Sequence, residues 1–413
     1  MLYSRKILEN INKWLFEKEI IILNGPRQIG KTSLLKLIKK QLLDQSVSKK
    51  NIFYLNLEEL DILDDLNKNP ENLLKYITDS DNKNYFFIDE IQYLDNPSNF
   101  LKHLYDKYSD KIKIITTGSS SLELKAQLQD SLVGRKVSFL IKTLDFEEFL
   151  RFKKSDCAKY LFQKDIPINI KNKFDEELNE YLVFGSMPAV VLQGDYELKQ
   201  TMLREYVGTY INKDIRSIGK IENISQFNTV VKILSSQIGN LLNISELANT
   251  ANIPRRKVEK YIELLEHTFV LNKIKSFHNN IRKQITKMPK IYFFDVGIRN
   301  AILNNFLSME NRQDCGELFE NFVFLELKNN LSDDIFFYRT ILKSEIDFII
   351  EKVNVIELIE VKYKKLQKPI DSRALRSLDV NKKKEKKMFV INRQLTSLDK
   401  NVQYVDYRNI GGL

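Results

Sequence analysis

The sequence predicts an α/β protein of several domains, in which a parallel sheet with helices on both faces comes first. Three observations predict this fold. The chain has 413 residues, which is too long for one compact core and implies two to four domains. An apolar run at 19–23 reads as a buried strand, and Leu34, Leu35 and Ile38 recur at helical spacing shortly after it. A second apolar strand, at 85–88, ends in acidic residues, as strands of such sheets do at their functional edge.

A glycine-rich turn, GPRQIGKTS, separates the first strand from its helix. Gly25, Gly30, Lys31 and Thr32 match the spacing G-x-x-x-x-G-K-[ST], in which backbone N–H groups close around phosphate oxygens. We expect Lys31 to reach the β- and γ-phosphates of ATP and Thr32 to place its hydroxyl on Mg²⁺. Ser33, the next residue, is a further candidate for binding the nucleotide. The alternative is a glycine turn without a ligand, which the flanking strand and helix disfavour.

The strand at 85–88 supplies the acids that hydrolysis requires. Asp89 is the candidate for the Mg²⁺ side of the site, and Glu90 is the candidate base for the attacking water. The alternative is an ordinary strand end with a solvated acidic pair. An intact phosphate loop earlier in the chain favours the catalytic interpretation.

A third strand, KIKIITTGSSSLEL, ends in hydroxyl groups. Thr116, Thr117 and Ser119 either face the nucleotide or cap the next helix, and Thr117 is our candidate for nucleotide contact. Farther along, Arg135 is a candidate γ-phosphate arginine, acting in its own chain or from a neighbouring subunit. The alternative for Arg135 is an ordinary surface arginine.

Composition indicates a protein of the cytoplasm. No run approaches 18 apolar residues and no signal-like segment opens the chain, so we expect neither a membrane span nor export. Two distant cysteines and three isolated histidines exclude a disulfide framework and a C-x-x-C zinc site. The formal net charge of +10 permits nucleic-acid binding, although a bias towards Lys, Asn and Ile would raise basicity in any case.

The middle of the chain is predicted to be helical. We expect the nucleotide domain at 1–145, a helical lid at 146–215, interrupted at Gly185 and Pro188, and a winged helix at 216–280.

In the predicted winged helix, Ser245 is the expected N-cap of a short helix, and Pro254 opens a second one. The start of the second helix carries Arg255, Arg256, Lys257 and Lys260. A recognition helix would present such charges to DNA phosphates, but winged helices also contact proteins, so both partners stay open.

The last domain, 281–413, contains carboxylates on apolar elements. Asp347 lies in the strand KSEIDFIIE, and Glu360 and Lys362 share one face at the end of the strand VIELIEVKYKK. Glu320, on a preceding helix with Glu317, completes an arrangement that resembles the PD-(D/E)xK nucleases. In those enzymes two carboxylates hold Mg²⁺ and the lysine stabilises an attacking hydroxide.

The resemblance to nucleases implies Glu320, Asp347 and Glu360 as metal ligands and Asp347, Glu360 and Lys362 as catalytic residues. The alternative is an inactive nuclease fold in which Asp347 pairs with Lys362. The basic stretch from Lys362 to Lys387 either follows a nucleic-acid backbone or is a solvated face.

An ordered set of motifs resembles a large prokaryotic family of AAA-type ATPases. The motifs are GPRQIGKTSLL, FFIDEIQYL, TTGSSSLEL, GRKVSFLIKTLDFEEFL and YLVFGSMPAVV, followed by YINKDI, YFFDVGIRNAI and GELFENFVFLELK. The last three resemble the C-terminal domain of unknown function of that family. The resemblance implies a P-loop NTPase core.

Together these observations predict an ATPase that uses ATP and Mg²⁺ and acts on DNA, with a metal-dependent nuclease site. The alternative is a nucleotide-operated switch whose C-terminal half binds a protein. The sequence leaves the oligomeric state open.

Overall fold

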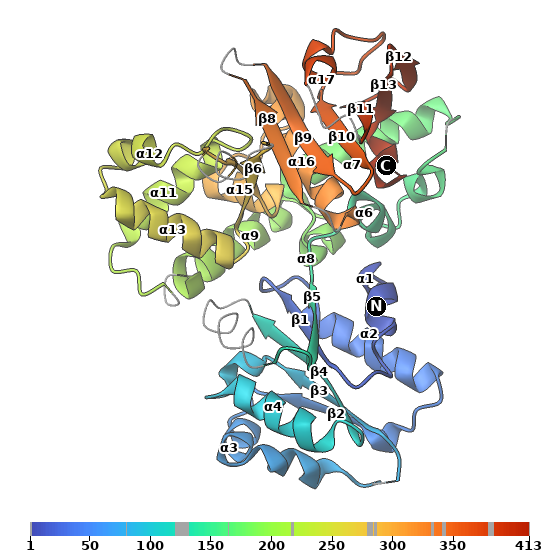
Figure 1. The fold of residues 1–413 in the computed structure, drawn as a ribbon, viewed down its shortest axis with the longest axis vertical. Coiled ribbons are helices and arrows are strands. Elements are labelled where there is room, and N and C mark those ends of the chain that lie inside the picture. The colour runs from blue at the N-terminus through green and yellow to red at the C-terminus, as the bar shows by residue number, and fades with distance from the viewer. Residues whose placement is uncertain are drawn as a thin grey trace. The chain divides into compact units, whose positions relative to one another are not determined.

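The computed structural model describes residues 2–79, 81–119, 132–163, 165–215, 219–278, 284, 287–331, 334–340, 344–378 and 384–412 (Figure 1). The chain forms two compact units. The first contains residues 1–142 and 267–269, and the second contains 143–266 and 270–413. Among the described residues, no helix is long and apolar enough to cross a membrane.

The first unit is built on a five-stranded sheet in the order β2-β3-β4-β1-β5, and every pair of neighbours is parallel. Parallel strands need crossover connections, and helices supply several of them. The strands are β1 (Ile20–Gly25), β2 (Ile52–Asn56), β3 (Asn84–Asp89), β4 (Ile112–Ser119) and β5 (Lys136–Leu140), and the helices are α1 (Ile7–Asn12), α2 (Lys31–Asp44), α3 (Leu60–Lys68) and α4 (Pro97–Tyr108). The predicted parallel α/β sheet is confirmed.

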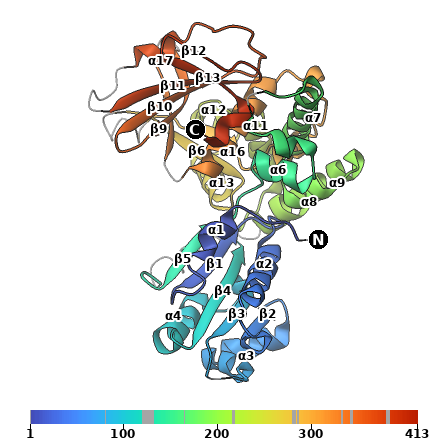
Figure 2. The same ribbon diagram turned by 90° about the vertical axis from the view of Figure 1, so that its right-hand side faces the viewer.

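Both faces of this sheet are covered. Ile20 and Ile22 of β1 belong to one hydrophobic cluster with Phe100 and Leu104 of α4. The alternate residue Ile21 is equally buried and points to the other face, because successive side chains of a strand alternate. In Figures 1 and 2, α2 and α4 lie on opposite sides of the sheet. Burial on both faces explains why these strands read as continuous apolar runs.

The second unit contains an eight-stranded mixed sheet in the order β12-β13-β11-β10-β9-β8-β6-β7. Strands β10, β11 and β13 are parallel to one another, whereas β9 is antiparallel to both β8 and β10. The strands are β6 (Leu271–Ser276), β7 (Lys290–Phe293), β8 (Ile335–Arg339), β9 (Glu345–Glu351), β10 (Val355–Val361), β11 (Glu385–Asn392), β12 (Ser397–Asp399) and β13 (Val402–Asp406).

Aromatic packing joins the first helices after residue 143 to a later helix and to the segment that follows β13. Phe146 of the first helix lies 5.7 Å from Phe322 and 5.6 Å from Tyr407 between ring centroids, and Tyr181 lies 5.0 Å from Phe322. The helices are α6 (Phe146–Phe152), α7 (Ile168–Phe184), α8 (Pro188–Leu192), α9 (Tyr196–Tyr206), α11 (Ile224–Ser236), α12 (Ile244–Ala251), α13 (Arg255–His267), α15 (Val296–Leu303), α16 (Cys315–Asn330) and α17 (Arg373–Ser377). The role of 146–215 as a lid over the nucleotide stays a prediction, as do the predicted domain boundaries.

Three helices and strand β6 lie within the predicted winged helix, and β7 follows after its predicted end. After α11, α12 and α13, strand β6 pairs antiparallel with β7, and Leu241 forms a further antiparallel bridge to Lys290. Helix α13 begins directly after Pro254, as predicted. The N-cap of α12 is Asn243, whose side chain accepts a hydrogen bond from Glu246 N at 3.2 Å, so the prediction of Ser245 was wrong. The helix begins before Ser245, and a cap must precede the first turn.

A close backbone approach joins α7 to α15. Asp295, at the start of α15, accepts hydrogen bonds from Ser186 N at 2.7 Å and Ile298 N at 3.0 Å. A Cβ on Gly297 would lie 2.1 Å from the carbonyl oxygen of Phe184, and a Cβ on Gly185 would lie 2.1 Å from the Asp295 carboxylate. Only glycine fits at these two positions without a shift of the backbone or of the carboxylate.

Gly297→Ala should therefore lower the free energy of unfolding by about 1–3 kcal/mol through overpacking. Gly316→Ala is the matched control, since Gly316 also lies in the first turn of a helix but has nothing within 4 Å of its added Cβ. It should be neutral or stabilising by up to about 1 kcal/mol. Chemical denaturation of the two variants measures the difference, and equal stability would contradict this account of the junction.

Candidate functional site

The turn between β1 and α2 has the backbone that a phosphate loop requires. Gly25 ends β1, where a Cβ would lie 2.7 Å from the carbonyl oxygen of Ile141. Gly30 has φ of 93°, a left-handed conformation that favours glycine, and it directly precedes α2. The open N–H groups at the start of this 14-residue helix favour an anion there.

Lys31 lies inside this turn. Its side chain is buried, and its Nζ donates hydrogen bonds to the carbonyl oxygens of Gly25 and Pro26, both at 2.9 Å. Burial lowers the pKa of the Lys31 ammonium, and the charges of Glu90 and Asp89 partly offset that effect. The loop thus holds a buried cation, and the carbonyl oxygens of Gly25 and Pro26 accept its hydrogen bonds.

Asp89 gathers three hydroxyl groups at the carboxyl edge of the sheet. Its Oδ2 accepts hydrogen bonds from Thr32 at 2.9 Å and from Tyr54 at 2.7 Å, and its Oδ1 accepts one from Thr117. Because β1, β3 and β4 are parallel, their carboxyl ends and the start of α2 meet at one edge. Hydroxyl and carboxylate oxygens are the donors that Mg²⁺ prefers, so Thr32 and Asp89 fit the predicted ion.

Glu90 has a strained backbone. Its φ is 59°, which is uncommon for a residue with a side chain, and its N–H donates to Thr117 Oγ1 at 2.9 Å. Its carboxylate accepts a hydrogen bond from the Gln92 amide. Thr117 therefore contacts both acids, and the structure brings the candidate metal-side acid and the candidate base together at the end of β3.

Other residues predicted for this site lie farther from its centre. Ser33 is exposed in the first turn of α2. Thr116 donates to the carbonyl oxygen of Ile88 at 2.8 Å and so supports the sheet. The side chain of Ser119 and the whole of residues 120–131 lie outside the part that the structure describes.

Arg135 lies where the parallel strands β1 and β5 begin, whereas the phosphate loop lies where β1 ends. The carbonyl oxygen of Arg135 accepts from Ile20 N, at the start of β1. Its guanidinium binds Asp106, with Nε at 2.6 Å and Nη2 at 3.2 Å from the carboxylate. The prediction that Arg135 contacts the γ-phosphate of its own chain was therefore wrong, because the length of β5 separates the two. Contact with a neighbouring subunit stays a prediction.

The second predicted site contains a cation that the sequence interpretation missed. Lys290, on β7, is 1% exposed, and its Nζ lies 2.9 Å from Glu320, 2.5 Å from Glu345 and 3.9 Å from Asp347. Burial would lower the pKa of Lys290, but these three carboxylates raise it. Tyr292 also donates to Glu320 Oε1, at 2.5 Å. Glu320 is thus committed to two donors within the protein.

Asp347 and Glu360 lie on two paired strands. Phe348 of β9 lies opposite Ile359 of β10, so Asp347 and Glu360 are the next residues of the two strands. Asp347 Oδ2 accepts from Val361 N at 2.7 Å, and Glu360 Oε1 lies 2.8 Å from Lys362 Nζ. Burial, followed by the charge of Glu320, raises the pKa of Asp347 to about 7. The inactive alternative expected Lys362 to pair with Asp347, but the ion pair that the Lys362 ammonium forms is with Glu360.

A divalent cation fits part of this cluster. Glu360 Oε2 is buried and has no hydrogen-bond partner among the described residues, and Asp347 Oδ1 lies 3.9 Å from Lys290 Nζ. These two oxygens suit Mg²⁺, which often binds one or two carboxylates and keeps several waters. Lys290 and Tyr292 both bind Glu320 through Oε1, so the predicted role of Glu320 as a metal ligand stays a prediction. Within the described ranges, no group of three or more His, Cys, Asp and Glu side chains is placed to hold a metal.

The basic residues at the start of α13 are largely accessible. Arg255, Arg256 and Lys260 are exposed; Arg255 pairs with Glu259 at 2.9 Å, and Lys257 donates to Gln226 at 3.0 Å. Exposed pairs of this kind contribute little to stability, so these cations remain able to contact a partner. The basic stretch from Lys362 to Lys387 lies partly outside the described residues.

Sequence reasoning missed Tyr54, Gln92, Lys290, Tyr292 and Glu345. A signal existed for Lys290, since it opens the otherwise apolar strand KIYFF, just as Asp347 interrupts an apolar strand. A buried charge in such a place needs a partner. Tyr54 gave no comparable signal, because tyrosine is an ordinary strand residue.

Comparison with known families supports the assignment of the first unit. Residues 17–150 match a family described as an AAA domain, so the predicted resemblance to AAA-type ATPases is confirmed for this part of the chain. Residues 175–308 and 315–409 match two domains of unknown function, DUF8612 and DUF4143. The nuclease-like and winged-helix interpretations of these segments stay predictions.

Relatives and solved structures extend over most of the chain. An uncharacterized protein of Methanocaldococcus jannaschii is 29% identical over 372 residues, covering 87% of this chain and 78% of that protein. An uncharacterized protein of Haemophilus influenzae is 29% identical over 353 residues, covering 83% and 82%. The Walker-type ATPase of Pyrococcus abyssi is similar to 73% of this chain and 96% of its own, with a TM-score of 0.48 and 13% identity.

Proposed function

We propose that this protein is a Mg²⁺-dependent ATPase that acts on duplex DNA. The observation that carries the proposal is the meeting of Lys31, Thr32, Asp89 and Glu90 at one edge of the parallel sheet. An AAA domain at residues 17–150 supports ATP as the nucleotide. The cation, the hydroxyl–carboxylate pair and the acid have distinct roles in phosphoryl transfer.

Each residue of this edge has a separate task. Lys31 binds the β- and γ-phosphates, and the N–H groups of the loop and of the start of α2 surround their oxygens. Thr32 and Asp89 hold Mg²⁺, which neutralises charge on the phosphates when it is bound. Glu90 orients and polarises the attacking water, and Gln92 and Thr117 hold Glu90 in place.

Two substitutions separate binding from hydrolysis. Lys31→Ala should weaken ATP binding, whereas Glu90→Gln should keep ATP bound and lower turnover by about 10²–10⁴-fold, because only water activation is lost. Lys36→Ala is the control, since Lys36 is exposed on the same helix. Nucleotide affinity and phosphate release measure the two effects. Wild-type turnover in Glu90→Gln would remove Glu90 from this role.

The DNA part of the proposal depends on the start of α13. Arg255, Arg256 and Lys260 are exposed in its first turns, next to Pro254, and β6 and β7 follow as an antiparallel pair. In helix-turn-helix proteins the start of the second helix enters the major groove, where cations meet phosphates. The alternative partner is a protein, which would make the chain a nucleotide-operated switch.

Replacement of Arg255, Arg256 and Lys257 by Ala should weaken duplex binding and lower the salt slope by about 0.9 for each phosphate that no longer meets a cation. The control is Lys273→Ala, which removes one cation of β6 that already pairs with Glu266 at 2.6 Å. Binding is measured across a salt titration, together with ATP turnover with and without duplex DNA. Unchanged affinity and slope would favour the protein partner and the switch.

A second candidate activity is metal-dependent DNA cleavage in the C-terminal domain. It is favoured by the orphaned Glu360 Oε2 beside Asp347, with Lys362 at the end of the same strand. Asp347 and Glu360 would hold the ion, which in such sites polarises the phosphodiester when it is bound. Lys290 keeps Glu320 and Glu345 paired in the absence of metal.

Asp347→Asn tests this candidate. If Asp347 and Glu360 share a cation, Mn²⁺ should raise the melting temperature of wild-type protein, and the variant should lose both that rise and any DNA cleavage while it retains ATP hydrolysis. Glu351→Gln is the control, because Glu351 is on the same strand but pairs with Lys384 at 2.8 Å. If Mn²⁺ does not stabilise wild-type protein and wild-type protein does not cleave DNA, the alternative of an inactive nuclease fold is favoured.

A further inference from the structure

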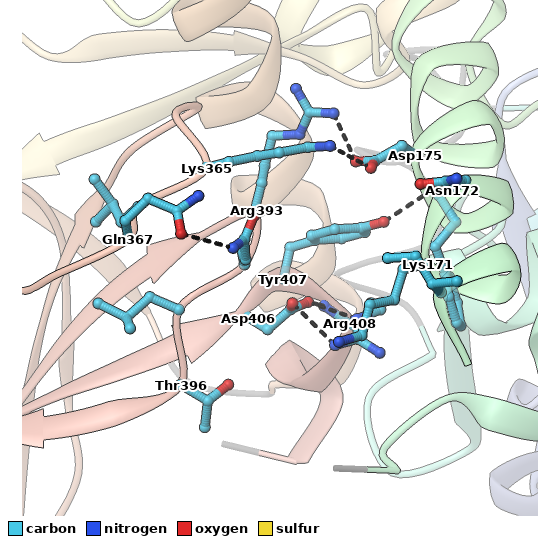
Figure 3. A pocket seen from close by; sticks show the side chains of 15 residues that line it. Lys171, Asn172, Asp175, Lys365, Gln367, Arg393, Thr396, Asp406, Tyr407 and Arg408 are labelled. Atoms are coloured by element: carbon cyan, nitrogen blue, oxygen red, sulfur yellow. Dashed lines mark hydrogen bonds and ion pairs between the residues drawn. The ribbon is translucent and has the colours of Figure 1, made fainter. Parts of the chain in front are cut away.

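A polar pocket of 470 Å³ lies between α7 and the C-terminal strands, outside both sites described above. Figure 3 shows Lys171, Asn172 and Asp175 on the α7 side, facing Gln367 and Thr396 on the other. Its volume is in the range of pockets that bind small molecules.

The pocket occupies a favoured position on the sheet. Its walls include residues 365–367, after β10, residues 393–396, after β11, and residues 406–408, which begin with the last residue of β13. These three strands are parallel, so their carboxyl ends meet at one edge. In open α/β sheets, ligands bind outside the carboxyl ends of the strands.

Positive charge exceeds negative charge around this pocket. Lys171, Lys365, Arg393 and Arg408 line it, together with Asp175 and Asp406. Asp175 binds Arg393 at 2.7 Å and Lys365 at 2.6 Å, and Asp406 holds Arg408 through two hydrogen bonds, at 2.8 and 3.0 Å. Two carboxylates thus pair with three of the four cations, and the four positive charges exceed the two negative ones.

Both guanidinium groups are held in fixed orientations, and each has one buried donor without a partner among the described residues. Arg393 lies over the ring of Tyr363 at 4.5 Å, and Arg408 over that of Phe174 at 5.2 Å. The side chains of both arginines are 10% exposed. Arg393 Nε and Arg408 Nη1 have no hydrogen-bond partner among the described residues, which is costly for a buried donor.

We propose that this pocket binds a phosphate ester. The excess of cations favours an anion, and pre-oriented guanidinium groups match the oxygens of phosphate particularly well. Gln367, Gln394 and Thr396 add neutral hydrogen-bonding groups to the wall. Either the terminal phosphate of a nucleic-acid strand or the phosphate of a free mononucleotide supplies this chemistry.

This inference is independent of the phosphate loop. Calorimetric titration of the full chain with a 5′-phosphorylated tetranucleotide, its unphosphorylated form and adenosine 5′-monophosphate tests it. The phosphorylated strand should bind more tightly than the unphosphorylated one. Equal binding of monophosphate and phosphorylated strand would identify a free mononucleotide as sufficient, and binding of the strand alone would identify a nucleic-acid end; both agree with a phosphate ester site.

Lys171→Glu should weaken binding of the phosphorylated ligand by about tenfold, since it reverses one exposed charge at the pocket. Lys400→Glu makes the same charge change at the opposite end of β13 and should leave affinity within about twofold. The phosphate loop is identical in wild-type protein and in both variants, so any ligand that it binds contributes equally to the three measured affinities.

Arg393→Gln should abolish binding, with its melting temperature as the check on folding; if this variant does not fold, Lys171→Glu decides. Equal affinity of wild-type protein, Lys171→Glu and Lys400→Glu, or equal binding of the phosphorylated and unphosphorylated strands, would overturn the proposal.

Discussion

A carboxylate on a buried strand must find hydrogen-bond donors or a cation, and both candidate sites of this protein are organised by that requirement. Asp89 ends β3 inside the first unit, and Asp347 lies in β9 inside the second. Neither is solvated freely. The residues that surround each carboxylate determine what chemistry the site can perform.

The two carboxylates are satisfied in different ways. Asp89 receives three hydroxyl groups, from Thr32, Tyr54 and Thr117, and no lysine or arginine forms an ion pair with it among the described residues. Hydroxyl donors can turn their lone pairs towards a cation, so this arrangement is compatible with Mg²⁺. Asp347 instead has a backbone N–H and the nearby Lys290, which is a permanent charge of the protein itself. The second site is therefore partly neutralised before any ion binds.

The carboxyl edges of parallel strands recur as places where polar residues gather. In the first unit this edge contains the phosphate loop, Asp89 and Thr117. In the second unit, the same edge of β10, β11 and β13 contains Glu360 and, beyond it, the pocket around Arg393 and Arg408. Side chains at this edge escape the apolar faces of the sheet while the strands hold their positions, so the fold concentrates charge there at little cost to the core.

The sequence by itself determined the features that depend on local spacing. Gly25, Gly30 and Lys31 belong to one turn, and the strand that precedes them and the helix that follows were predictable because hydrophobic periodicity is a local property. The same holds for the α13 start at Pro254. Only the tertiary structure decided which distant residues meet: Tyr54 at Asp89, Lys290 among Glu320, Glu345 and Asp347, and Arg135 at the edge away from the phosphate loop. These contacts depend on strand order and register, which a linear pattern does not encode, because residues far apart in the chain become neighbours only when the sheet is assembled.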